Sequence, residues 1–366
     1  MIYLDHGATS LPKPPAVVHA MSRALAVCGN PGRGGHPAAA AAERAVYRCR
    51  TLAGEMFHTP PERVAFTLNC THGLNIAIRS LFRPGQRVAI TGFEHNAVTR
   101  PLYALGAQVT VAGRRLFDWD DTLERLEDAL KAGAQGAVLT HVSNVFGYIL
   151  PLEAMAGLCR QYGVPFIVDA AQSAGTLPLD LEALGAAYIA MPGHKGLLGP
   201  QGTGLLLCGR EPEPLLFGGT GSVSRQQEMP DFLPDKLEAG TVNVPGIAGL
   251  AEGLAYLARV GPETILRREQ RAAEAAARGL AEAGYRVFSG PHQGGTVSFL
   301  HPEADCEELA EALSHRGIAL RAGLHCAPTA HESAGTLETG TIRASFGHDA
   351  TLSQAQALVR AAKACK

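Results

Sequence analysis

Short apolar runs alternate with longer segments of helical spacing over the first two thirds of the chain. The spacing of apolar positions predicts helices at 15–27, 41–57, 72–82, 121–131 and 153–163. Short β-rich runs predict strands at 63–68, 87–91, 108–112, 136–142, 165–171, 187–191 and 203–208. Because these strands are apolar almost throughout, they predict an α/β fold whose mostly parallel sheet is covered by helices on both faces.

The pattern changes after about residue 245. Helical spacing continues at 245–260 and in an Ala/Glu/Arg-rich stretch at 263–283, and later helices are predicted at 306–317 and 352–364. Strand-like segments lie at 285–289, 295–300, 318–323 and 340–346. We therefore predict an N-terminal arm (1–14) that packs with the small domain, a large domain (15–245) and a small C-terminal α+β domain (246–366).

Composition and charge exclude several classes of protein. The 366 residues are 46% hydrophobic and carry a net charge of −2, and no tract is biased, which excludes disordered, collagen-like and coiled-coil proteins. The balanced charge predicts no basic stripe, so we expect neither nucleic acid nor an anionic membrane as a partner. The first ten residues lack the basic and apolar regions of an export signal, and we expect a cytoplasmic protein.

The eight cysteines are scattered and include no C-x-x-C pair, so we predict neither a disulfide framework nor a metal site. Most are expected to be small buried side chains. Cys326 differs because it follows a strand in a Gly/Pro-containing loop, beside Arg321 and His325. Cationic or imidazole neighbours favour the thiolate, which makes Cys326 the candidate nucleophile.

Lysine is scarce in this chain, with 6 Lys against 26 Arg. Lys195 follows a predicted strand in Gly-His-Lys-Gly, where burial would favour a free amine able to form a Schiff base with an aldehyde cofactor. A solvated lysine in a surface turn fits the local pattern equally well. The other five lysines lie near the termini, on helices or in polar loops, and are expected to be solvated.

Other polar residues also follow predicted strands, where ligands bind to parallel sheets. Asp169 ends a strand and either meets a cation such as a pyridinium nitrogen or caps a helix. Thr71 and the free N–H groups of the next helix form either a phosphate seat or ordinary capping. His95 either stacks on a planar ring or caps a loop, and Asn144 either binds a ring substituent or caps a turn. Gly218–Gly221 lacks the Lys-Ser/Thr of a nucleotide-binding loop.

Arg343 interrupts an otherwise apolar, alternating strand. Facing inward, its guanidinium would need an anion, and a substrate carboxylate would satisfy it through two hydrogen bonds. Facing outward, it would be a solvated edge residue.

Together and in this order, these segments resemble one family: the class V aminotransferase-like cysteine desulfurases, pyridoxal-phosphate enzymes of fold type I, in the branch that includes selenocysteine lyases. The resemblance covers nearly the whole chain. It rests on YLDHGAT (3–9), NCTHGLNIAI (69–78), EHNAV (94–98), THVSNVFGYILP (140–151), VDAAQSAG (168–175), GHKGLLGPQGTG (193–204), GGTGS (218–222), EAGTVNVPGIAGL (238–250), RAGLHCAP (321–328) and TIRAS (341–345).

The resemblance implies a cofactor site for pyridoxal 5'-phosphate. Lys195 would carry the cofactor, Asp169 would pair with the pyridine nitrogen and Gln172 would donate to the phenolate oxygen. The other residues that it places around the cofactor are Thr71, His72, His95, Asn144 and His194, together with Thr220 from the second subunit of a homodimer. Three residues, His6, His72 and Pro192, depart from the usual motifs and bear on cofactor affinity and substrate preference.

The resemblance also implies a reaction. Lys195, His95 and Cys326 would be catalytic, while Arg343 and Asn144 would bind the substrate. L-Cysteine would become L-alanine, and its sulfur would pass to Cys326 as a persulfide and then to an acceptor protein. Two alternatives stay open: a selenocysteine lyase or related β-elimination enzyme, and a non-catalytic sulfur carrier on the same scaffold.

Overall fold

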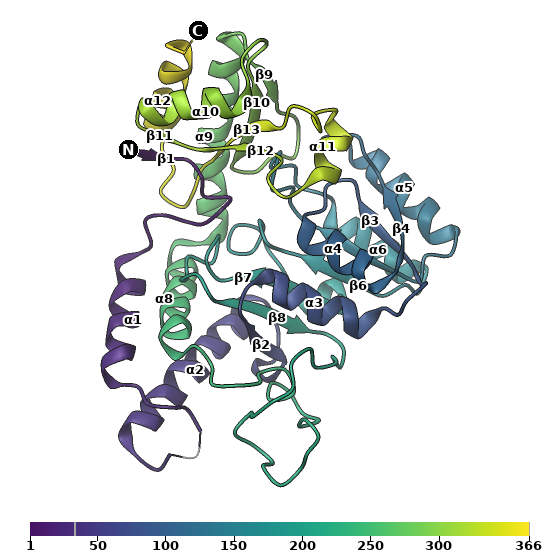
Figure 1. The fold of residues 1–366 in the computed structure, drawn as a ribbon, viewed down its shortest axis with the longest axis vertical. Coiled ribbons are helices and arrows are strands. Elements are labelled where there is room, and N and C mark those ends of the chain that lie inside the picture. The colour runs from purple at the N-terminus through teal and green to yellow at the C-terminus, as the bar shows by residue number, and fades with distance from the viewer. Residues whose placement is uncertain (33, 366) are drawn as a thin grey trace.

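The computed structural model describes residues 1–32 and 34–365. Within them, a seven-stranded sheet lies at the centre of the large domain (Figure 1), in the order β2-β8-β7-β6-β5-β3-β4. Its strands are β2 (Val64–Thr67), β3 (Arg87–Thr91), β4 (Gln108–Ala112), β5 (Gly136–Thr140), β6 (Phe166–Asp169), β7 (Tyr188–Pro192) and β8 (Gly204–Cys208). Of these seven strands, only β8 runs opposite to the other six, which confirms the predicted mostly parallel sheet.

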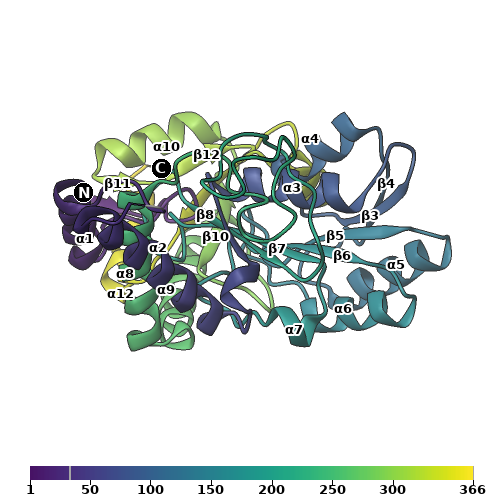
Figure 2. The same cartoon turned by 90° about the horizontal axis from the view of Figure 1, so that it is seen from below.

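Helices cover both faces of this sheet, as Figure 2 shows. They are α2 (Pro37–Met56), α3 (Cys70–Leu81), α4 (Asn96–Leu105), α5 (Trp119–Lys131), α6 (Leu152–Gln161) and α7 (Leu181–Leu184), with a 3-10 turn at Pro61–Arg63. Neighbouring strand residues belong to different apolar clusters: Val138 to one that includes residues of α3 and α4, and Leu139 to one that includes residues of α2, α5 and α6. Burial on both faces explains why the strands are apolar at almost every position.

The helix after residue 243 belongs to the large domain. α8 (Val244–Val260) packs against α1 (Pro15–Val27) and α2, and Ile247, Leu250 and Leu254 join the core beside the sheet. The predicted boundary at 245 therefore falls at the start of a helix that packs with the large domain. Apolar spacing predicted this helix but could not identify the surface that its apolar face covers. A second long helix, α9 (Pro262–Glu282), follows α8 after Gly261.

The small domain contains a four-stranded antiparallel sheet in the order β12-β13-β10-β9. Its strands are β9 (Arg286–Phe288), β10 (Thr296–Leu300), β12 (Arg321–Gly323) and β13 (Thr341–Ser345), and its helices are α9, α10 (Cys306–His315), α11 (Pro328–Ala334) and α12 (Leu352–Lys363). The strand predicted at 318–323 is divided: β11 (Ile318–Ala319) pairs with β1 (Ile2–Tyr3), and β12 pairs with β13. The N-terminal arm thus lies against the small domain, with Leu4 in its core.

Among the described residues, we find no helix with the length and apolar character needed to cross a lipid bilayer.

Candidate active site

The carboxyl ends of β2, β3, β5, β6 and β7 open onto one cavity. These five strands run in the same direction, so the residues that follow them meet at one edge of the sheet. Seven of the predicted site residues line this cavity: Thr71, His95, Asn144, Asp169, Gln172, His194 and Lys195.

Asp169 provides a buried carboxylate at the end of β6. It lies in register with Thr140 of β5 and Ala190 of β7, and its side chain accepts a hydrogen bond from the Ala171 N–H at 2.9 Å. The Cys70 thiol lies 3.5 Å from the same oxygen, Oδ1. Burial raises the pKa of Cys70 well above its ordinary value, so this thiol stays protonated and donates to Asp169. No local sequence pattern indicates this contact.

Lys195 lies in the turn after β7. Burial lowers the pKa of its ammonium group, and the guanidinium of Arg343 lowers it further. The turn needs glycine at position 196, because a Cβ there would lie 2.3 Å from the carbonyl oxygen of Ala174. The Lys195 side chain lines the cavity beside Asp169, so the alternative of a solvated turn lysine does not describe it.

His95 both caps a helix and lines the cavity. Its Nδ1 accepts a hydrogen bond from the Ala97 N–H at 2.9 Å, at the start of α4. Burial lowers the pKa of the ring, which favours neutral imidazole. Since Nδ1 accepts a hydrogen bond, the proton of the neutral ring resides on Nε2.

The start of α3 supplies the other end of the cavity. Asn69 caps this helix by accepting from the His72 N–H at 2.9 Å, and Thr71 lies in the first turn, where helices attract anions. His194 lines the same cavity, and its buried Nδ1 has no hydrogen-bond partner among the described residues. Burial lowers the pKa of His194 to about 4, so its ring is neutral at neutral pH.

Lys13 is not a solvated lysine as predicted. Its Nζ donates to the carbonyl oxygen of His194 at 2.7 Å and to the hydroxyl of Ser10 at 2.6 Å. Burial lowers the pKa of Lys13 to about 8. These contacts join the N-terminal arm to the turn that carries Lys195. The sixth lysine, Lys366, lies outside the described residues.

Arg343 faces inward from β13, so the alternative of a solvated edge residue is wrong. Its Nη2 donates to Asp5 at 2.8 Å, and its Nη1 donates to the carbonyl oxygen of Asn144 at 2.9 Å. Its buried Nε has no partner among the described residues. The Asn144 side chain donates from Nδ2 to the carbonyl oxygen of His325. The buried Oδ1 of Asn144 has no hydrogen-bond partner among the described residues. Sequence reasoning missed Asp5, although it lies in the YLDHGAT motif.

Cys326 is exposed on the loop between β12 and α11, as predicted. Its backbone has a positive φ of 56°. Its carbonyl oxygen accepts a 2.7 Å hydrogen bond from the Asn96 N–H, next to His95. This bond holds the loop that carries the thiol beside the start of α4.

His72 and Thr220 lie elsewhere. The His72 ring folds back so that Nδ1 accepts from the Leu68 N–H at 3.2 Å, and it lines a second cavity with Glu238. Its side chain therefore does not join the predicted cofactor set, because it leaves α3 in a different direction from Thr71. Thr220 lines a third cavity beside Arg50. Its predicted role concerns a second copy of the chain.

The main cavity has the polar groups that pyridoxal phosphate needs. Asp169 offers a buried carboxylate for a pyridinium nitrogen, and Lys195 offers an amine with a lowered pKa. The unpaired Asn144 Oδ1 and His194 Nδ1 are buried polar atoms that a ligand could satisfy. The residues present therefore fit this cofactor.

The fold and this site define a fold type I enzyme of the pyridoxal-phosphate class. Residues 2–358 match the model of the Aminotransferase class-V family, so the chain belongs to that family. It is 32% identical to a probable cysteine desulfurase of Methanothermobacter thermautotrophicus, over 98% of this chain and 92% of that protein. The cysteine desulfurase of Haloferax volcanii is 30% identical, over 94% of this chain and 85% of that protein.

Solved structures agree with this assignment. The apo structure of cysteine desulfurase from Thermococcus onnurineus NA1 superposes with a TM-score of 0.89 at 30% identity, covering 98% of this chain and 93% of that one. The Escherichia coli cysteine desulfurase CsdA, in an S-sulfonic acid form, gives a TM-score of 0.87 at 28% identity, covering 100% and 94%. The predicted family and fold are confirmed.

Proposed function

We propose that this protein is a pyridoxal-phosphate-dependent cysteine desulfurase that converts L-cysteine to L-alanine and places the sulfur on Cys326. The observation that carries the proposal is the bond between the Asn96 N–H and the Cys326 carbonyl. It joins the loop of the exposed Cys326 to Asn96, the neighbour of His95, and His95 lines the cavity that Lys195 and Asp169 also line. A class-V enzyme without sulfur chemistry would have no use for a thiol in that place.

The cofactor, when bound, supplies an aldehyde that links to amines and a ring that accepts the electrons left at the substrate Cα. Lys195 would hold it covalently and Asp169 would keep its ring nitrogen protonated. Thr71 and His194 would bind its phosphate, and Gln172 would donate from Nε2, which now bonds the Gly7 carbonyl at 2.9 Å. Thr220 of a second copy would complete the phosphate site in a homodimer.

Lys195 has the properties of the base. With its pKa lowered by burial, its Nζ would be able to take the Cα proton of the bound substrate. His95 lines the same cavity and carries a proton on Nε2 that it can exchange with the substrate. Arg343 would bind the substrate carboxylate through its unpaired Nε, with Asn144 beside it.

The sulfur step needs no external oxidant or reductant. The Cys326 thiolate forms a bond to the substrate sulfur, and the bond between that sulfur and the substrate Cβ breaks. The electron pair of the broken bond stays with the carbon skeleton, which takes up protons and leaves as alanine. Cys326 then carries a persulfide, whose outer sulfur passes to a thiol of an acceptor protein, so we propose such a partner and a cytoplasmic setting.

An absorption spectrum tests the cofactor part. We expect a near-visible band after addition of pyridoxal phosphate and its loss in Lys195→Ala. A colourless protein under both conditions would contradict the proposal and favour a non-catalytic sulfur carrier.

Alanine release tests the reaction. We expect turnover of L-cysteine, abolished in Cys326→Ala although the absorption band remains. Full turnover by Cys326→Ala would rule out the persulfide step. Turnover of L-selenocysteine alone, in a parallel assay, would instead identify a selenocysteine lyase.

A further inference from the structure

Two buried histidines and one aspartate, which the proposed reaction steps do not use, meet beside the active site. His6 lies in the N-terminal arm, and His348 and Asp349 follow β13. One potential ligand atom from each residue lies within 4.8 Å of the other two. The His6 Nε2 is 3.8 Å from Asp349 Oδ1. Segments that are more than 300 positions apart in the sequence thus bring three ligand-bearing side chains to one point.

The two imidazoles are held in place by their surroundings. His6 is 7% exposed and His348 is 8% exposed. Tyr3 and His6 form a T-shaped ring pair with centroids 5.1 Å apart, and Tyr256 and His348 form another at 5.7 Å. Gly347 is required here, because a Cβ at that position would lie 2.0 Å from His6 Nδ1.

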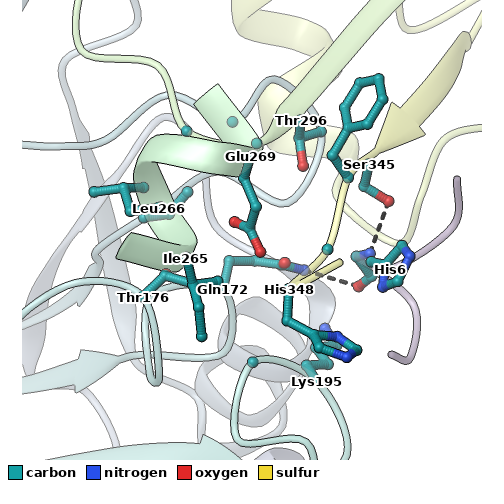
Figure 3. Close-up of a pocket in the computed structure, with 18 of the residues that line it drawn as sticks. His6, Gln172, Thr176, Lys195, Ile265, Leu266, Glu269, Thr296, Ser345 and His348 are labelled. Atoms are coloured by element: carbon teal, nitrogen blue, oxygen red, sulfur yellow. Dashed lines mark hydrogen bonds between the residues drawn. The ribbon is translucent and has the colours of Figure 1, made fainter. Parts of the chain in front are cut away.

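Aromatic packing explains the ring orientations but leaves polar atoms unsatisfied. The Nδ1 atoms of both His6 and His348 are buried without a hydrogen-bond partner in residues 1–32 and 34–365. A phenylalanine would fill either site without that penalty. Figure 3 shows both rings at one cavity together with Glu269 and Lys195. Asp349 is half-exposed, which gives an ion a path from solvent.

From this convergence we propose that His6, His348 and Asp349 form a binding site for a divalent zinc-type cation. Two imidazoles and one carboxylate form a common zinc ligand set, and a fourth position is left to water. Tetrahedral zinc ligands lie about 3.4 Å from one another, so small side-chain rotations suffice to close the site. The charge of Asp349 opposes the positive charges of Lys13 and Arg268 near His348.

A bound ion would fasten the N-terminal arm to the segment after β13. The arm also carries Asp5, which pairs with Arg343 of β13. The ion would therefore stabilise the fold, and the existence of the site does not depend on the proposed desulfurase reaction. The proposed site differs from the sequence-based expectation of no metal. Its ligands come from the two ends of the chain, so no motif with metal-ligand spacing indicates them.

Zinc titration of the full-length protein tests the site without any activity assay. The Cys326→Ser variant serves as the parent, so that the exposed thiol does not bind the ion. The protein is first dialysed against a chelator that removes metal ions. Zn²⁺ is then added in the presence of a chromophoric chelator that competes for it. We expect one Zn²⁺ per chain, and at least about tenfold weaker binding in Asp349→Asn and in His348→Gln, each made in the parent. Zinc should also raise the melting temperature of the parent but not of Asp349→Asn.

The matched control is His315→Gln, which removes an exposed histidine that lies 3.7 Å from Glu311. Its zinc affinity should equal that of the parent. The Asp349 side chain is exposed, and asparagine has nearly the same shape. Weaker zinc binding in Asp349→Asn therefore reports loss of the site rather than misfolding, which is the other explanation for weaker binding in His348→Gln. Equal zinc affinity in the parent and in Asp349→Asn, or no zinc bound by the parent, would overturn the proposal.

Discussion

The guanidinium of Arg343 donates a 2.8 Å hydrogen bond to the carboxylate of Asp5, which lies 338 positions earlier in the sequence. The Arg343 side chain is 3% exposed, so its charge needs a partner inside the protein. The same carboxylate accepts a 2.9 Å bond from Arg321, whose side chain is 52% exposed. Asp5 therefore positions Arg343 before any substrate arrives.

Asp5→Asn should destabilise the protein and weaken substrate binding. Removing one charge of a buried pair leaves the other uncompensated, which typically lowers the free energy of unfolding by about 3–5 kcal/mol. We expect KM for cysteine to rise more than kcat falls, because the proposed role of Arg343 is to bind and orient the substrate without breaking a bond. Urea denaturation and steady-state kinetics measure the two effects.

Arg321→Gln is the control for this prediction. It removes the exposed partner of the same carboxylate, and exposed ion pairs contribute about 0–1 kcal/mol. Equal losses of unfolding free energy in Asp5→Asn and Arg321→Gln would show that the buried pair has no special weight.

The order of elements could be predicted from the sequence because most of them bury one apolar face. The helix at 15–27 and the strands at 87–91 and 108–112 have the bounds that the pattern predicts. Helix α4 was missed, since Pro101 and the polar start at Asn96 interrupt its apolar spacing. The predicted boundary at 245 falls at the start of α8, because periodicity shows that α8 has an apolar face but not which surface covers it.

The sequence could predict the part of the site that lies at the carboxyl ends of the parallel strands. Lys195, Asp169 and His95 all follow parallel strands, so their meeting at one sheet edge follows from topology. Contacts from other parts of the chain do not follow from it. Asp5 and Cys70 contact Arg343 and Asp169 through packing that no local pattern encodes.

Glu94→Gln should change how stability depends on pH. Burial raises the pKa of Glu94 from 4.5 to about 8, although the Thr91 hydroxyl and the Thr140 N–H both donate to its Oε1. Between these two values the folded protein keeps a proton that the unfolded chain has released. Stability should therefore fall as pH rises through this window, at up to ~1.4 kcal/mol per pH unit.

Glutamine has no carboxyl proton to release. The melting temperature of Glu94→Gln should therefore rise relative to that of the wild type between pH 5 and pH 8. Thermal melts at pH 5, 6.5 and 8 measure the difference. Glu263→Gln replaces a side chain that is 83% exposed and should follow the wild type at each pH. A constant difference between Glu94→Gln and wild type would contradict the prediction.

Thiol labelling of the native protein should show one fast cysteine. Cys326 is exposed, whereas Cys28 and Cys365 are half-buried. The other five cysteines are buried: Cys49, Cys70, Cys159, Cys208 and Cys306. Burial raises the pKa of Cys49 to about 12, and similar shifts at other buried thiols keep them protonated and unreactive.

A chromogenic disulfide reagent should therefore react with one thiol per chain in a fast phase that Cys326→Ala lacks. Cys28→Ala should keep that phase and lose only slower labelling. A fast phase that survives in Cys326→Ala would mean that another thiol is more accessible than the fold indicates.

Gly196→Ala should displace the turn that carries Lys195. The new Cβ would lie 2.3 Å from the carbonyl oxygen of Ala174, a backbone atom that cannot rotate away. Overpacking of this kind lowers the free energy of unfolding by about 1–3 kcal/mol, and a shifted turn moves the Lys195 amine from its place beside Asp169. We expect a lower melting temperature and loss of the near-visible absorption band.

The control is Gly157→Ala in α6, where a new Cβ meets no atom within 4 Å and should stabilise the helix by about 0.5–1 kcal/mol. Unchanged stability and absorption in Gly196→Ala would show that the turn can relax without moving Lys195.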